Sequence, residues 1–271
     1  MSMNKRPPLR RSAPVETEND GVIEGRNAVI EALRSGTAID KIYVARGETD
    51  AALGHIASTA RGRGVVVVEA DRRKLDNMSR THAHQGVIAL AAVREYASVE
   101  DILNAAREKG EPPLIVVCDE LSDPHNLGAV IRSAAAFGAN GVILPERRSA
   151  SVTAAAWKVS AGAAAHMPVA RVVNLTKAIE SLKERGYYSV GLDGGGDALV
   201  GETGFETDPL VVVLGSEGNG LSRLVRETCD SIAGIPMSNM VESLNASVAA
   251  GITLYSVARA RREAGAAADA K

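Results

Sequence analysis

Three polar segments of the chain, residues 119–132, 215–222 and 236–247, each follow a short apolar run that is typical of a buried strand. Patterns typical of helices separate the apolar runs, so we expect a parallel sheet with helices on both faces. Ligands of such sheets bind beyond the carboxyl ends of the strands. The three segments therefore define a candidate site at one edge of an α/β domain.

The first segment carries Asn126 and Arg132, at and after the start of a helix expected over residues 127–137. Taken singly, Asn126 fits a helix cap and Arg132 fits a solvated helix residue. Taken as a pair beside a strand end, the two side chains fit a polar clamp for a ribose or a phosphate. Both interpretations stay open at this point.

The second segment is a glycine-rich loop in which Gly215, Gly218 and Gly220 follow the pattern G-x-x-G-x-G. A dinucleotide site has G-x-G-x-x-G, and a P-loop has Gly-Lys-Ser/Thr, so neither motif is present. Glycines still allow the backbone to approach a ligand closely. Because Glu217 would repel phosphate, a positively charged ligand without phosphate fits better. A plain tight turn is the alternative.

The third segment ends at a helix expected over residues 244–262, with Ser243 as its cap. Asn245 and Ser247 both lie in the first turn of that helix. Gly251 and the small residues around it allow another backbone to pack closely. An ordinary helix start is the alternative, but it does not explain why two further polar residues crowd one turn.

The bulk composition is that of a soluble globular protein, with 271 residues, 45% hydrophobic and 24% charged. A net charge of -2 argues against a nucleic-acid binder that works by bulk charge, while it permits a local basic patch. Cys118 and Cys229 lack disulfide-framework or metal-site spacing. With no signal peptide and no membrane-length apolar run, these features indicate a cytoplasmic protein with no membrane segment and no metal.

The composition along the chain divides it into five parts. Residues 1–20 form a basic and acidic tail that we expect to be disordered, with a basic arm reaching RNA phosphates as the alternative. Residues 21–97 fit a small α/β domain, and residues 98–113 fit a linker helix that enters the next domain. Residues 114–262 fit a larger α/β domain, and residues 263–271 fit a frayed tail.

Together, the three segments resemble the three motifs of the SpoU/TrmH family of RNA 2'-O-ribose methyltransferases, also called SPOUT enzymes. In the smaller domain, residues 25–29, 42–44, 75–76 and 84–87 look like the substrate-binding domain of that family. The arrangement is most similar to the RlmB-type 23S rRNA guanosine methyltransferases. The matching motif residues are 123–128 with Arg132, 214–218 with 220–221, and 235–237 with 243–249.

The resemblance implies an L30e-like N-terminal domain and a C-terminal SPOUT domain with a parallel sheet and a deep trefoil knot, a rare exception to the rule against knots. It also implies S-adenosylmethionine as cofactor, RNA (23S rRNA in the leading hypothesis) as substrate, and a homodimer with the active site at the interface. The methyl donor is already a sulfonium, so no metal is required. The implied cofactor-binding residues are Leu214, Gly215, Ile235, Met237 and Leu244, and the implied catalytic residues are Asn126, Arg132, Glu217, Asn245 and Ser247.

Two features of the resemblance leave alternatives open. Arg132 is the family's candidate base, but a guanidinium with a pKa of about 12 or higher is an awkward base, so an orienting role stays equally open. Asn239 stands where the family usually has glycine, and Glu242 adds a charge beside it, which bears on cofactor affinity or substrate choice. Asn is the residue that best replaces glycine in left-handed backbone.

Other functions fit the sequence less well than the leading one. The same chemistry could act on a tRNA ribose, or on an rRNA adenosine as in antibiotic-resistance members of the family. The N-terminal domain favours rRNA, because minimal tRNA enzymes of this family lack it. A catalytically inactive RNA-binding protein is disfavoured by the retained Arg132, Glu217, Asn245 and Ser247. A nucleotide-dependent oxidoreductase is disfavoured by the glycine spacing.

Overall fold

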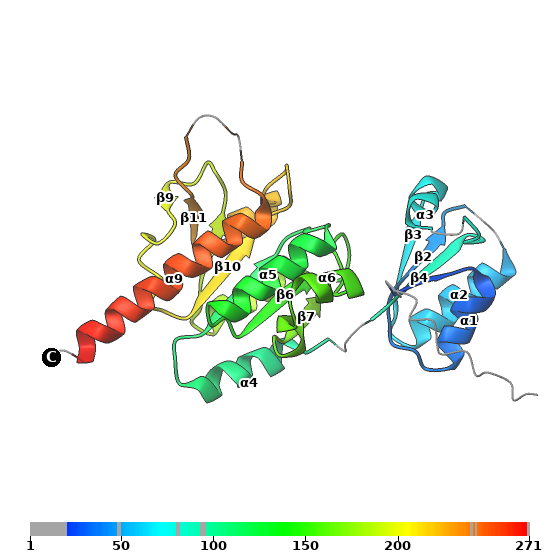
Figure 1. The fold of residues 1–271 in the computed structure, drawn as a ribbon, viewed down its shortest axis with the longest axis horizontal. Helices are drawn as coiled ribbons and strands as arrows, with labels where there is room; N and C mark the ends of the chain where they lie inside the picture. Colours follow the sequence, from blue (N-terminus) through cyan, green and yellow to red (C-terminus); the bar gives the residue numbers. More distant parts are fainter. Residues whose placement is uncertain are drawn as a thin grey trace, which may run out of the picture.

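The computed structural model describes residues 21–47, 50–79, 82–92, 96–238, 241 and 243–269. Two α/β domains follow one another along the chain (Figure 1). Each has its own hydrophobic core. None of the helices in the described part of the chain is long and apolar enough to cross a membrane.

The N-terminal domain is built on a four-stranded sheet with the order β1-β4-β2-β3. β2 pairs with β3 in parallel and with β4 antiparallel, so the sheet is mixed. Helices α1 and α2 pack on one core cluster, and Leu75 of α3 belongs to a second cluster. The elements are β1 (Val22–Glu24), α1 (Arg26–Arg34), β2 (Ile39–Ala45), α2 (Ala51–Gly62), β3 (Val66–Ala70), α3 (Arg72–Met78) and β4 (Val87–Ala91).

The C-terminal domain is built on a seven-stranded sheet with the order β7-β6-β5-β10-β8-β11-β9. Every neighbouring pair is parallel, which confirms the expected parallel sheet. The elements are α4 (Val99–Lys109), β5 (Leu114–Cys118), α5 (Pro124–Ala136), β6 (Gly141–Pro145), α6 (Ala154–Val159), a 3-10 turn (Ala163–Ala165), β7 (Val169–Val172), α7 (Leu175–Glu184), β8 (Tyr188–Leu192), β9 (Ala198–Leu199), β10 (Leu210–Leu214), α8 (Arg223–Thr228), β11 (Ser231–Gly234) and α9 (Ala246–Asp269).

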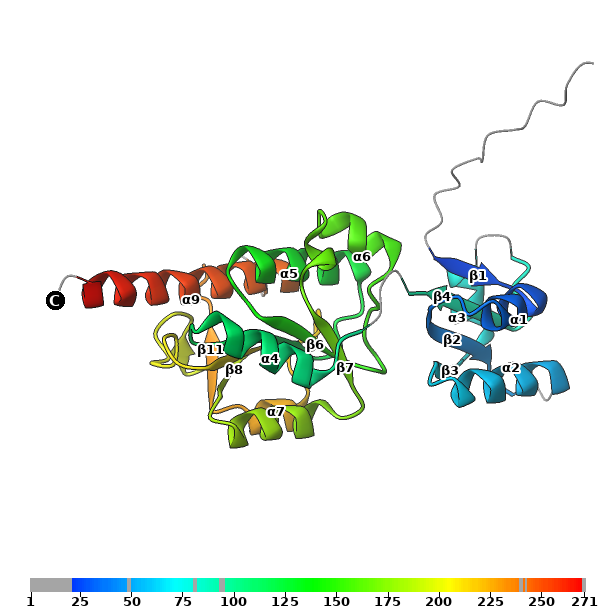
Figure 2. The same ribbon diagram turned by 90° about the horizontal axis from the view of Figure 1, so that it is seen from below.

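Helices cover both faces of the parallel sheet (Figure 2). Residues of α5 and α9 join one core cluster, and residues of α4, α7 and α8 join the other. The central strands β5 and β10 are buried along their whole length, since each lies between two neighbours and two helical layers. This burial leaves their carboxyl ends as the places where polar loops can leave the core.

Both ends of α9 differ from the sequence-based expectation, and α5 begins at Pro124, earlier than the expected start at residue 127. Asn245, and not Ser243, caps α9, because the Asn245 carboxamide oxygen accepts hydrogen bonds from the backbone N–H groups of Ser247 and Val248. α9 also continues to Asp269, beyond the expected end at residue 262. The alanines after residue 263 are strong helix formers, which explains helix where fraying was expected. The trefoil knot stays a prediction, because strand order alone does not describe how the chain threads.

Candidate active site

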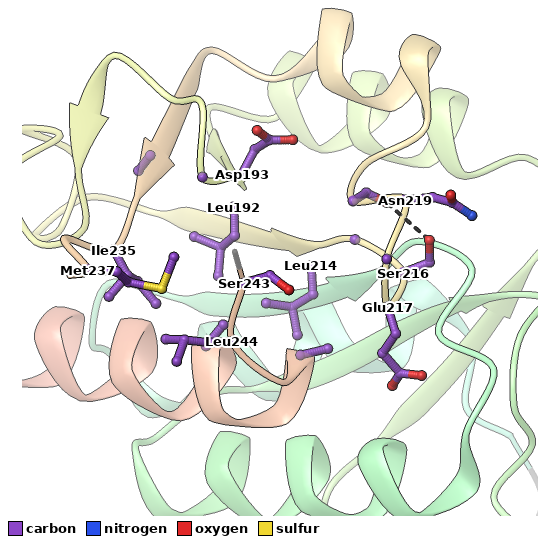
Figure 3. Close-up of a pocket in the computed structure, with 17 residues that line it drawn as sticks. Leu192, Asp193, Leu214, Ser216, Glu217, Asn219, Ile235, Met237, Ser243 and Leu244 are labelled. Atoms are coloured by element: carbon purple, nitrogen blue, oxygen red, sulfur yellow. Dashed lines mark hydrogen bonds between the residues drawn. The ribbon is translucent and has the colours of Figure 1, made fainter. Parts of the chain in front are cut away.

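A cavity of about 300 Å³ lies at the carboxyl ends of β8, β10 and β11 (Figure 3). Its volume falls at the lower end of the range for small-molecule sites. The cavity is walled by apolar side chains, glycine backbone and a few polar groups. The lining residues are Leu192, Asp193, Gly194, Leu214, Gly215, Ser216, Glu217, Gly218, Asn219, Gly220, Ala233, Ile235, Met237, Ser243, Leu244, Ala246 and Ala249.

One wall of the cavity is the glycine loop after β10, which folds back on itself. Ser216 and Gly220 exchange two backbone hydrogen bonds of 2.9 and 3.0 Å. A Cβ atom on Gly215 would lie 2.2 Å from the carbonyl carbon of Gly220, so only glycine fits there. Gly218 has a φ of 88°, a left-handed value that other residues rarely adopt. The loop therefore presents backbone to the cavity, as the sequence analysis expected.

Within the described part of the chain, the two ionisable residues that line the cavity, Asp193 and Glu217, are both acids. Asp193 follows β8, where its carboxylate pairs with Arg226 at 2.8 Å and accepts from the Gly195 N–H at 2.9 Å. Glu217 follows β10 and its side chain is drawn pointing away from Asp193 (Figure 3). Acidic groups around an apolar floor suit a ligand that carries positive charge, such as a sulfonium.

All five residues expected to hold the cofactor line this cavity. The end of β8, with Leu192, Asp193 and Gly194, was not expected there. The signal for it was present in the sequence, because the polar run Asp-Gly-Gly-Gly follows a strand of the same parallel sheet. These five residues are Leu214, Gly215, Ile235, Met237 and Leu244, and their role in cofactor binding stays a prediction.

Four of the five expected catalytic residues form one hydrogen-bonded network beside the cavity. The Asn126 amide donates to the Glu217 carboxylate. The Asn245 amide donates to the Asn126 carbonyl oxygen at 3.0 Å. The Ser247 hydroxyl donates to Asn245 at 2.6 Å. The network joins the first turn of α5, the loop after β10 and the start of α9, which is how three distant motifs meet.

Arg132 is the expected catalytic residue that stands outside this network. It lies on α5 with an exposed side chain and, in the described part of the chain, forms no hydrogen bond or ion pair. Asp123, and not Asn126, caps α5, so the amide of Asn126 is available to the network. The structure thus separates a fixed polar network from one free guanidinium.

The remaining reactive side chains do not add to the site. Burial raises the pKa of the Cys118 and Cys229 thiols to about 12, so neither supplies a thiolate nucleophile near neutral pH. Within the described residues, no three His, Cys, Asp or Glu side chains gather in a way that could hold a metal. Asn239 and Glu242, the two departures from the family pattern, lie outside the described residues.

Family models match both domains of the chain. The model of the SpoU rRNA Methylase family matches residues 113–255, and the model of RNA 2'-O ribose methyltransferase substrate binding matches residues 22–97. The second match covers the small α/β domain described above. These two matches follow the same order along the chain as the two domains of the structure.

Relatives and solved structures match over most of the chain. A Mycobacterium ulcerans protein named as an uncharacterized tRNA/rRNA methyltransferase is 50% identical over 254 residues, which cover 93% of this chain and 81% of the relative. The SpoU methyltransferase AviRb from Streptomyces viridochromogenes, crystallised with AdoMet, is 26% identical with a TM-score of 0.57, covering 93% of this chain and 94% of its own. An AdoMet-bound rRNA methyltransferase from Sinorhizobium meliloti is 25% identical with a TM-score of 0.55, covering 88% and 86%. With these matches added to the cavity and its network, the chain belongs to the SpoU rRNA methylase family.

Proposed function

We propose that this SpoU-family RNA methyltransferase transfers the methyl group of S-adenosylmethionine to the ribose 2'-hydroxyl of a guanosine in 23S rRNA in the cytoplasm. One observation carries the proposal. Glu217 belongs both to the wall of the cavity and to the network of Asn126 and Asn245, so cofactor and substrate chemistry meet at one residue. The bound cofactor supplies an electrophilic methyl group, and the chain supplies binding and alignment.

The cavity fits the cofactor by its chemistry. Leu214, Ile235 and Leu244 offer apolar contact, and Gly215 offers close backbone approach. Among the described residues, the charged side chains that line the cavity are those of Asp193 and Glu217, which favours a sulfonium over a nucleotide phosphate. Two solved structures of family members contain AdoMet, which supports the same cofactor for this chain.

In this proposal the polar network orients the ribose, and Arg132 contacts the 2'-oxygen or an adjacent phosphate. A ribose hydroxyl is a poor nucleophile until its proton is drawn away. Asn126 and Asn245 are held by each other and by Glu217, so they can orient a ribose without first ordering themselves. Arg132 forms no ion pair within the described residues. Its guanidinium is therefore available to bind the 2'-oxygen or an adjacent phosphate.

The N-terminal domain supplies the RNA contact in this proposal. Arg26, Asn27, Arg72 and Gln85 line a hollow on its surface. The Arg26 side chain is oriented by a 3.0 Å hydrogen bond to the Gln85 carbonyl and by an ion pair with Asp50. Guanidinium and amide groups in one hollow suit phosphates and base edges. The match of this domain to a substrate-binding model favours a large, folded RNA such as rRNA.

A homodimer with the site at its interface is supported by an apolar stripe on α9. Val248, Ile252 and Tyr255 follow helical spacing and are 48%, 38% and 50% exposed. Tyr255 also packs edge-on against Phe137 at the end of α5. Exposed apolar side chains in a row are typical of a protein interface. A second copy that covers this stripe would lie beside the helix that carries Arg132.

The test is methyl transfer from labelled S-adenosylmethionine to total RNA from cells that lack this protein. We expect label in 23S rRNA, recovered as 2'-O-methylguanosine after digestion. Label in tRNA, or in 2'-O-methyladenosine, would replace the substrate in the proposal and keep the reaction. Cofactor binding without transfer to any RNA would instead favour an inactive RNA-binding protein.

A further inference from the structure

Two adjacent charged residues of the N-terminal domain are buried. Asp40 and Lys41, in β2, are only 4% and 2% exposed. Charged side chains at the end of a strand in a small domain normally point to solvent. Their side chains bind residues of the C-terminal domain, more than one hundred residues further along the chain. The two residues are therefore buried by docking of one domain against the other.

Asp40 is held by Arg171 of β7. One Arg171 nitrogen lies 2.5 Å from the Asp40 carboxylate, and it also donates to the Asp40 backbone carbonyl at 3.2 Å. The other terminal nitrogen donates to the carbonyl of Glu146 at 2.7 Å. The Ser151 hydroxyl donates to the second carboxylate oxygen of Asp40. Both charged groups thus have their hydrogen-bonding capacity directed to fixed partners.

Tyr96, in the segment that connects the domains, completes the contact. Its ring lies beneath the Arg171 guanidinium, with 5.0 Å between the guanidinium carbon and the ring centroid. Its hydroxyl oxygen accepts from the Val152 N–H at 3.0 Å. Asp40, Lys41, Tyr96, Ser151 and Arg171 are called the interdomain cluster below.

The interdomain cluster is also connected to the loop that leads into α5, the helix that carries Asn126. The Lys41 ammonium donates to the Ser149 carbonyl at 3.1 Å. The Ser149 hydroxyl and the Ala150 N–H both donate to the Leu121 carbonyl, at 3.2 and 2.6 Å. Leu121 is fully buried and lies five residues before Asn126. One short segment, residues 149–152, therefore contacts the substrate-binding domain on one side and the loop before α5 on the other.

Buried charges specify geometry more strongly than apolar contact does. An unpaired buried charge is costly, so Asp40 and Arg171 stay together only in the orientation that satisfies both. An apolar interface would tolerate sliding between the domains, whereas directed hydrogen bonds to named oxygens do not. The cluster consequently favours one placement of the substrate-binding domain over a freely tethered one.

We propose that Asp40 and Arg171 are positioning residues for methyl transfer: the interdomain cluster holds the RNA-binding domain at the angle and distance that bring the target ribose to the cofactor cavity. The inference rests on the proposed function of that cavity. Neither residue touches the cofactor or the reacting atoms. Their effect comes through alignment, since small errors in the approach of oxygen to methyl cost large factors in rate.

The experiment uses the full chain with Asp40→Asn, Arg171→Gln and the double variant. Arg185→Ala is the matched control, because Arg185 forms an equally short ion pair with Glu100 inside one domain. We expect each single variant to lose about tenfold or more in kcat/KM for RNA. The double variant should lose no more than the worse single one, since the two residues act through one contact. The cofactor Kd should stay within about twofold in every variant, and the control should keep full activity.

Small-angle scattering of the RNA-free proteins provides the second readout. We expect a larger radius of gyration in the Asp40 and Arg171 variants than in wild type and control, because the domains are released. Unchanged scattering with unchanged kcat/KM overturns the proposal. Additive losses, or a cofactor Kd that rises in step with the lost activity, overturn it as well, because they indicate separate or general damage. If wild type methylates no RNA, the proposed function fails and the positioning role fails with it, while the scattering still reports the docking.

Discussion

The network of Glu217, Asn126, Asn245 and Ser247 and the interdomain cluster are both built from polar side chains drawn from distant parts of the chain. They differ in burial. The network is open to solvent at Glu217 and Asn245, and its amide groups can form further hydrogen bonds. In the interdomain cluster, Asp40 and Lys41 are buried and their charged groups are directed to fixed protein partners.

The difference in burial distinguishes polar groups that can bind a substrate from polar groups that fix how two domains dock. Open polar groups can exchange water for a substrate, so changes there should alter turnover more than folding. Enclosed polar groups define which surfaces fit together, so changes there should alter geometry and stability while cofactor binding persists. Substitutions in each region, and in the free Arg132 beside them, test whether the separation holds.

The largest effect is expected from Arg132→Ala. The variant should lose methyl transfer by about 100-fold or more, because it removes the charge that the proposed function assigns to the reacting oxygen or an adjacent phosphate. Binding of S-adenosylmethionine, measured by calorimetry, should be unchanged. Arg262→Ala is the control, since Arg262 is exposed on the far part of α9. Near-normal turnover in the Arg132 variant would remove it from the site.

The next largest effect is expected from Gly215→Ala. The new methyl group would collide with the backbone of Gly220, so the loop after β10 must open and the cofactor wall is lost. We expect the Kd for S-adenosylmethionine to rise about tenfold or more. Gly195→Ala is the matched control, because its Cβ has room at ordinary contact distance. Equal cofactor affinity in both variants would contradict the assignment of this wall.

A smaller effect is expected from Asn126→Asp. The variant sets a second carboxylate against Glu217, and the repulsion should break the network while the fold persists. Turnover should fall about tenfold, with cofactor affinity changed less than turnover. Asn126→Gln serves as the comparison, because it keeps the amide on a longer stem. If the aspartate variant turns over as fast as wild type, the network does not orient the ribose.

The smallest effect is expected from the pH dependence of Lys41. Burial lowers the pKa of Lys41 from 10.5 to about 8, although the neighbouring Asp40 opposes the shift. The folded protein therefore releases this proton near pH 8, whereas the unfolded chain keeps it until about pH 10.5. Between these values the unfolded state binds more protons, so the contribution of Lys41 to the free energy of unfolding rises with pH. Below pH 8 the cost of burying the ammonium is present in full.

Urea unfolding at pH 7 and pH 9.5 measures this contribution through Lys41→Met. Wild type should gain stability relative to the variant as the pH rises across that window. Lys109→Met, at an exposed position at the end of α4, should show no such relative gain. A difference between wild type and Lys41→Met that stays constant with pH would show that Lys41 is not buried as a charge.

The sequence predicted the parallel sheet and the cavity wall because both follow from local patterns. Runs such as 114–118 and 210–214 are continuous and apolar, and the loops after them carry unusual glycines and amides. The residue that caps α9 was harder to predict from the sequence, because Ser243 and Asn245 are both good N-cap residues. Only the path of the backbone selects Asn245.

The interdomain cluster gave no such local signal. In the sequence, Asp40 and Lys41 fit the solvent-facing positions of a strand, and Arg171 fits a charged residue near a strand end. Their burial depends on contacts across 131 positions of the chain. Those contacts form only when the two folded domains dock against each other. The hydrophobic periodicity within either domain therefore could not indicate them.

Residues 149–152 determine which features of the N-terminal domain are needed for docking. Lys41 contacts this segment through the main-chain carbonyl of Ser149, so this part of the docking contact does not depend on which side chain residue 149 carries. The docking surface for the N-terminal domain therefore combines one main-chain acceptor with the side chains of Ser151 and Arg171, and an exchanged domain would have to provide partners for all three.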